Sequence, residues 1–89
     1  MDILKRASAG TLESSDVYVE IEPSENALEI QLESVVIEQF GESIRQVVEE
    51  VLQEWAVEKA FVRVVDRGAL ECVIRARVET AVLRGKGEC

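Results

Sequence analysis

Two stretches of the chain alternate strictly between apolar and polar residues, at positions 17–22 and 28–33. This alternation is the pattern of a β-strand with one buried face. The positions that would point inward are Val17, Val19, Ile21, Leu28, Ile30 and Leu32. Residues 23–26, Pro-Ser-Glu-Asn, separate the two stretches and have the chemistry of a turn, because proline fixes φ and short polar side chains bond local backbone. So short a turn predicts that the two strands pair as an antiparallel hairpin.

From residue 36 the spacing of apolar residues changes to that of a helix. Steps of three and four residues place one apolar stripe along a single face: Val36, Ile37, Phe40, Ile44, Val47, Val48, Val51 and Trp55. Ser34 precedes the stripe and is a suitable N-cap, because its hydroxyl can accept a hydrogen bond from a free backbone amide. Residues 36–55 are therefore expected to form a helix that covers the strands, with Trp55 at least partly buried.

A third alternation, over residues 60–65, predicts another strand, which Asp66-Arg67-Gly68 ends. A second helical stripe follows between residues 70 and 82, made of Leu70, Val73, Ile74, Val78, Ala81 and Val82. Gly85 and Gly87 are helix-ending residues. Residues 84–89 are therefore expected to form a frayed tail.

The order strand, strand, helix, strand, helix (β-β-α-β-α) predicts an α+β two-layer sandwich, with both helices on one face of a mostly antiparallel three-stranded sheet. Residues 1–16 show no sustained period and are expected to form a flexible arm, with room for a short strand. The 89 residues suit a single domain, 1–89. Tyr18 and Phe61 fall on the open face of the sheet, where they either pair with each other or mark a contact surface.

The formal net charge is −8, which disfavours binding to nucleic acid or to an anionic membrane. Residues 1–58 hold fourteen acids and three bases, net −11, whereas residues 59–89 are net +3. The acidic part either faces a basic partner or only aids solubility. No apolar run approaches the roughly 20 residues of a membrane span, and no signal peptide is expected. Two cysteines, Cys72 and Cys89, indicate no disulfide framework, and a cytoplasmic location is expected.

The chain lacks the residues on which most catalytic sites depend. It has no histidine, no closely spaced cysteine pair and no glycine-rich phosphate loop, so neither a catalytic site nor a metal site is expected. Cys72 falls on the polar side of the second helix, where it either touches a partner or is half buried. Arg77 lies inside the apolar stripe of that helix. Its guanidinium would reach water or a carboxylate of the sheet, or else bind a phosphate.

Residues 9–17, Ala-Gly-Thr-Leu-Glu-Ser-Ser-Asp-Val, hold glycine, two serine hydroxyls and two carboxylates. These are ordinary turn residues. Neither serine has a histidine to activate it as a nucleophile, but a hydroxyl on an exposed segment suits modification by another enzyme.

Residues 10–14, Gly-Thr-Leu-Glu-Ser, followed by Asp16-Val17, resemble the attachment motif of the acyl carrier protein of citrate lyase, its gamma subunit. Three further stretches resemble that family in the same order, at residues 38–45, 66–72 and 74–77, so the resemblance spans about residues 9–83. One departure is Ser15, where the family usually has glycine.

The resemblance implies a non-catalytic carrier subunit. Ser14 would carry 2'-(5''-triphosphoribosyl)-3'-dephospho-CoA through a phosphodiester, and the attached thiol would hold acetyl and citryl groups while citrate is cleaved to acetate and oxaloacetate. The implied partners are the transferase (alpha) and lyase (beta) subunits and the prosthetic-group transferase. The alternatives are the acyl carrier of malonate decarboxylase, which uses the same kind of group, and an unmodified α+β interaction domain.

The two adjacent serines need to be distinguished. The motif places the group on Ser14 and makes Ser15 dispensable. If the alternation of the first strand extends back to these residues, their side chains point to opposite faces, and an enzyme docked on one face reaches only one of them.

Overall fold

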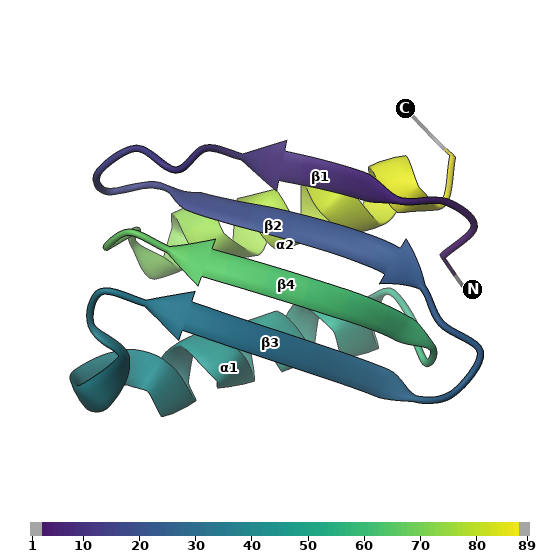
Figure 1. Ribbon diagram of the computed structural model, residues 1–89, viewed down its shortest axis with the longest axis horizontal. Coiled ribbons are helices and arrows are strands. Elements are labelled where there is room, and N and C mark those ends of the chain that lie inside the picture. Colours follow the sequence, from purple (N-terminus) through teal and green to yellow (C-terminus); the bar gives the residue numbers. More distant parts are fainter. Residues whose placement is uncertain (1–2, 88–89) are drawn as a thin grey trace.

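The computed structural model describes residues 3–87, which form one mixed sheet and two helices (Figure 1). The elements are β1 (Ala7–Gly10), β2 (Val17–Pro23), β3 (Leu28–Ser34), α1 (Ile37–Glu54), β4 (Ala60–Asp66) and α2 (Glu71–Gly85). The α+β class and the order β-β-α-β-α from β2 onward are as the sequence predicts. The strand count is not, because part of the N-terminal arm forms β1.

The strands lie in the order β1-β2-β4-β3, so β4 occupies the middle of the sheet between β2 and β3. β2 pairs with β4 antiparallel, and β3 pairs with β4 parallel. The expected antiparallel hairpin of residues 17–22 with residues 28–33 is therefore wrong. The physical reason is α1, which links β3 to β4 as a crossover helix and so brings these two strands together in parallel.

Both helices cover the same face of the sheet (Figure 1). α2 packs against β1 and β2, while α1 lies beside α2 and packs against β3. The alternation of β2 and β4 is confirmed, since their inward residues are fully buried: Val17, Val19, Ile21, Ala60, Val62 and Val64. Val47 of α1 is buried with them, and Trp55 packs partly buried against the core, as its place in the stripe predicts.

The first turn of α1 extends past the sheet. α1 has 18 residues and is about 27 Å long, whereas a seven-residue strand spans only about 23 Å. Ile37 and Phe40 are consequently exposed, although the helical stripe predicts them to be inward. The N-cap residue is Val36 rather than Ser34, whose hydroxyl instead donates to Asp66 Oδ2 and accepts from the Val36 amide.

On the open face of the sheet Tyr18 lies opposite Val65, and Phe61 lies opposite Glu22. The two aromatic residues therefore do not form a cross-strand pair. The Tyr18 hydroxyl donates instead to Glu20, which lowers the pKa of that carboxyl, and Arg6 lowers it further.

The C-terminal end is more ordered than the expected tail. α2 continues through Arg84 and Gly85, and the carbonyl of Gly85 accepts from the amides of Leu4 and Lys5. The Lys86 side chain is buried, and its ammonium donates to the carbonyl of Trp55 at 2.7 Å. The tail predicted over residues 84–89 is thus wrong for residues 84–86, and residues 88 and 89 lie outside the described part of the chain. No helix within residues 3–87 is long and apolar enough to cross a membrane.

Candidate functional site

The loop between β1 and β2, residues 11–16, contains the serines that the sequence singles out. Gly10 ends β1 with φ of 89°, a conformation that L side chains rarely adopt. A Cβ at this position would lie 1.8 Å from the carbonyl oxygen of Val17. Only glycine fits here, so the start of the loop is fixed directly beside its end.

The loop contains a tight turn over residues 13–16, closed by the amide of Asp16, which donates to the carbonyl of Glu13 at 3.2 Å. Ser15, its third residue, has φ of 66°, and Ser14 before it has no positive φ. That is the pattern of a type II turn, which favours glycine at the third position. The backbone at position 15 therefore suits glycine better than serine.

Because residues 13–16 form a turn, the alternation of β2 does not extend back to Ser14 and Ser15. The condition under which their side chains would point to opposite faces of an extended strand is therefore not met. The two residues differ instead in backbone conformation.

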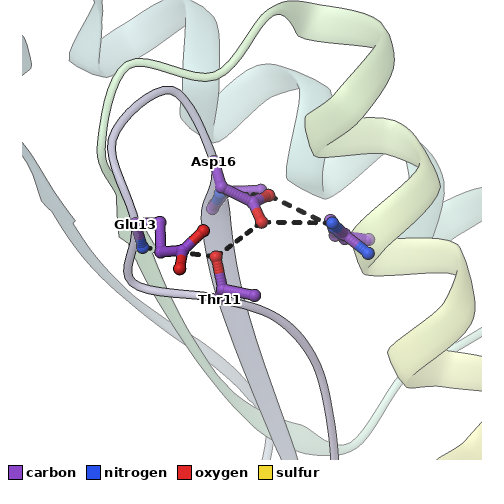
Figure 2. A network of polar contacts seen from close by, with 5 residues as sticks. Thr11, Glu13 and Asp16 are labelled. Atoms are coloured by element: carbon purple, nitrogen blue, oxygen red, sulfur yellow. Dashed lines mark hydrogen bonds and ion pairs between the residues drawn. The ribbon is translucent and has the colours of Figure 1, made fainter.

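The carboxylate of Asp16 is the centre of the polar network shown in Figure 2. Its Oδ2 accepts from Thr11 Oγ1 at 2.7 Å, and its Oδ1 accepts from the Val17 amide at 2.7 Å. Arg77 of α2 donates from Nε and Nη2 to the same two oxygens, at 3.2 and 3.1 Å. These bonds, with that of Thr11 the strongest cause, lower the pKa of Asp16 from 3.8 to about 2. The carboxylate is thus held ionised at neutral pH.

Thr11 also accepts a hydrogen bond from the Glu13 amide at 3.2 Å, so its hydroxyl links both halves of the loop (Figure 2). The other side of the loop is attached to the β4–α2 connection. The Ser15 amide donates to the carbonyl of Arg67 at 2.8 Å, and the Arg67 amide donates to the carbonyl of Asp16 at 2.9 Å. The loop is therefore held by its own side chains, by α2 and by the turn after β4.

Ser14 is exposed on this held loop. None of the hydrogen bonds found among residues 3–87 uses the Ser14 hydroxyl. An exposed turn residue can bear a bulky covalent group without displacing packed side chains. The serine that the resemblance identifies therefore lies where a large attached group fits.

The structure also decides between the alternative interpretations that the sequence leaves open for two residues of α2, Arg77 and Cys72. The Arg77 guanidinium reaches a carboxylate, as one of the two interpretations expects, but that of Asp16 in the β1–β2 loop rather than one in the sheet. Cys72 is a free and exposed thiol rather than a half-buried one.

Sequence reasoning missed Thr11 and Asp16 as the residues that hold the loop. The available signal was a threonine and an aspartate five positions apart on either side of the serines. Within residues 3–87, no cluster of three or more histidine, cysteine or acidic side chains could hold a metal ion.

Comparison with known proteins finds acyl carrier proteins. Residues 4–85 match the family described as "ACP: Malonate decarboxylase delta subunit (MdcD)". The citrate lyase acyl carrier protein 2 of Salmonella typhimurium is 56% identical over 85 residues, covering 94% of this chain and 88% of that protein. The citrate lyase acyl carrier protein of Enterobacter sp. (strain 638) is 53% identical over 88 residues, covering 99% and 91%.

A chain in the crystal structure of a Pseudomonas malonate decarboxylase hetero-tetramer in complex with malonate has a similar fold. Its TM-score is 0.79 at 25% identity, covering 90% of this chain and 82% of that one. The similarity to the citrate lyase carriers is stronger and extends over nearly the whole chain. The protein belongs to the family of the citrate lyase acyl carrier proteins, carrier subunits that hold a prosthetic group.

Proposed function

We propose that this protein is the acyl carrier subunit of a citrate lyase and that Ser14 carries the group derived from 2'-(5''-triphosphoribosyl)-3'-dephospho-CoA, which loses diphosphate when it is attached. The observation that carries the proposal is the exposed Ser14 hydroxyl on a loop held by Asp16, Arg77 and Arg67. The relatives at 53% and 56% identity, which are named as citrate lyase carriers, support the choice of complex.

Attachment requires Ser14 Oγ to displace diphosphate from the triphosphate of the donor. A bond forms between Oγ and the nearest phosphorus, the bond from that phosphorus to the diphosphate breaks, and the serine proton is released. The chain has no histidine to accept this proton. In this proposal the chain presents the hydroxyl, and the prosthetic-group transferase supplies the base.

The attached group supplies a thiol that holds acetyl and citryl groups as thioesters while citrate is cleaved to acetate and oxaloacetate. The chain's own contribution is the fixed base of this tether. A loop bonded to α2 and to the β4–α2 connection limits where the tether starts, and a tethered reactant reaches a high effective concentration near its partners. The reactions themselves belong to the transferase (alpha) and lyase (beta) subunits. A cytoplasmic location is part of the proposal, since the exposed Cys72 thiol suits a reducing compartment.

The second candidate is the acyl carrier of malonate decarboxylase. It is favoured by the description of the matching family and by the fold shared with a chain of the Pseudomonas malonate decarboxylase crystal. The identity to that chain is 25%, less than half of the identity to the citrate lyase carriers.

The test is a reconstitution followed by intact-mass measurement. The purified chain is incubated with the prosthetic-group transferase and its donor, and the loaded carrier is then combined with the catalytic subunits of citrate lyase or of malonate decarboxylase. We expect the chain to gain the mass of one group and to support citrate cleavage but not malonate decarboxylation. Support of malonate decarboxylation alone would select the second candidate, and no gain of mass would favour an unmodified interaction domain.

A further inference from the structure

Most exposed apolar side chains lie at the end of the molecule that carries the Ser14 loop. Within residues 3–87 six large apolar residues are exposed: Leu4, Leu12, Val35, Ile37, Phe40 and Leu70. All except Leu4 lie in the β1–β2 loop, the β3–α1 connection, the first turn of α1 or the β4–α2 connection, which Figure 1 shows at one end of the sheet. We call these five residues the apolar end patch. Leu4 precedes β1, at the opposite end.

Two residues of the apolar end patch, Phe40 and Leu70, line an open pocket of about 350 Å³ between the beginnings of α1 and α2. Its apolar lining includes Val36, Ile44, Val47 and Ile74. Phe40 and Leu70 are 55% and 72% exposed, so they form part of its rim. Exposed apolar surface of this kind, next to a hollow, marks a contact site for another molecule.

The pocket lies next to the Ser14 loop. The Ser15 amide bonds the carbonyl of Arg67, and Gly68, the next residue, lines the pocket. Standard bond lengths then place the Cα atoms of Ser14 and Gly68 within about 8 Å of each other, given this 2.8 Å hydrogen bond. An enzyme whose active site reaches Ser14 Oγ must therefore lie beside the pocket.

The size of the end supports the same conclusion. The two shorter extents of the molecule are 23 and 17 Å between Cα atoms. A protein partner of ordinary size covers about 800 Å² of its partner's surface. A contact of that area is comparable in size with this whole end, which holds the Ser14 loop, Phe40 and Leu70.

The charges around the patch indicate the chemistry of the partner. Exposed acidic side chains at this end outnumber the basic one, Arg67: they are Glu13, Glu38, Glu42 and Glu71. Asp16 is already paired with Arg77. A complementary surface would present an apolar projection with basic side chains around it.

We propose that the enzyme that joins the prosthetic group to Ser14 docks on the apolar end patch, with an apolar side chain in the α1–α2 pocket and basic side chains against the surrounding acids. This inference rests on the proposed function. It adds the docking surface, its apolar contacts at Phe40 and Leu70, and the charge of the partner.

The test measures binding of the prosthetic-group transferase to carriers that also have Ser14→Ala, so that no reaction follows binding. Leu70→Ser and Phe40→Ser remove the apolar contacts, and Leu4→Ser is the matched control, because Leu4 is 74% exposed at the other end. Leu70 is the N-cap residue of α2 with extended backbone, so serine there suits the fold. We expect the dissociation constant from calorimetry to rise about tenfold or more for both patch variants and less than twofold for the control.

Three results would overturn the inference. The first is equal affinity for the patch variants and Leu4→Ser while the parent chain with Ser14 still gains the group, which leaves the proposed function intact. The second is a parent chain that gains no group, in which case both proposals fall. The third is a wild-type chain that sediments as a dimer and becomes a monomer in the Leu70→Ser variant, which would show that the patch joins two copies. If the affinity of the transferase for the carrier does not fall with added salt, the part of the proposal that assigns basic side chains to the transferase is wrong.

Discussion

Arg77 holds both carboxylate oxygens of Asp16, with Nε 3.2 Å from Oδ1 and Nη2 3.1 Å from Oδ2, although the two residues are 61 positions apart in the sequence. This two-point contact joins the middle of α2 to the loop that carries Ser14 (Figure 2). The serine is therefore presented from a braced loop rather than from the flexible arm that residues 1–16 suggest.

Replacing Arg77 tests the brace. Arg77→Lys keeps the positive charge but cannot make the two parallel bonds, so we expect faster amide hydrogen exchange in residues 11–16. The melting temperature should fall by only a few degrees, because Arg77 is 41% exposed and ion pairs at the surface contribute little. Arg84→Lys is the control, since Arg84 bonds the backbone of Ser8 with one nitrogen. Equal exchange in the two variants would show that the brace does not hold the loop.

The pKa of Asp16, about 2 against an ordinary 3.8, predicts a particular pH dependence. The folded protein stabilises the ionised form of the Asp16 carboxylate more than the unfolded chain does. This stabilisation is complete above pH 3.8 and is lost as the pH falls through about 2. The difference in melting temperature between wild type and Asp16→Asn should therefore be constant from neutral pH to about pH 5 and should shrink between about pH 4 and pH 2. A difference that persists unchanged to pH 2 would show that this carboxylate has an ordinary pKa.

The left-handed backbone of Ser15 predicts that glycine is tolerated or favoured at this position. A side chain at positive φ costs about 1 kcal/mol, and the greater freedom of glycine in the unfolded chain offsets part of the gain. Ser15→Gly should change the free energy of unfolding by between zero and about +1 kcal/mol, measured by urea titration. Ser14→Gly, at a position without positive φ, should not stabilise. Greater stability for Ser14→Gly than for Ser15→Gly would be inconsistent with the turn described here.

Val47 tests the packing of α1 on the sheet. It is 5% exposed, so Val47→Asp buries an unpaired charge and should cost about 3 kcal/mol or more, enough to unfold a small domain. Gln46→Asp, on the exposed side of the same helix, should cost about 1 kcal/mol or less. The comparison uses thermal and urea unfolding followed by circular dichroism. Similar losses for the two variants would mean that α1 does not present Val47 to the core.

Local patterns in the sequence predict the elements of this fold better than they predict its topology. The alternation over residues 17–22 and 60–65 identifies the buried faces of β2 and β4, because each inward residue has to be covered. Strand neighbours depend instead on contacts between distant segments. The turn at Ser24 suggests a hairpin, but β4 inserts between β2 and β3 because α1 connects β3 to β4 in parallel.

The candidate site, like the fold, could be predicted from the sequence only in part. The motif at residues 10–14 identifies Ser14, which the structure places on an exposed loop. The support of that loop could not be read from the sequence, because Asp16 depends on Arg77 and Ser15 depends on the carbonyl of Arg67. Both partners are more than fifty positions away in the chain, and only the folded sheet and α2 bring them to the loop.

The central claim is that the group is attached to Ser14 rather than to its neighbour Ser15. The most direct measurement is peptide mapping by mass spectrometry of wild type, Ser14→Ala and Ser15→Ala, each produced with the prosthetic-group transferase. We predict the added mass on Ser14 in wild type and in Ser15→Ala, and no added mass in Ser14→Ala, which should melt within a few degrees of wild type because the Ser14 side chain is exposed. Added mass on Ser15, or modification of the Ser14→Ala variant, would contradict the account.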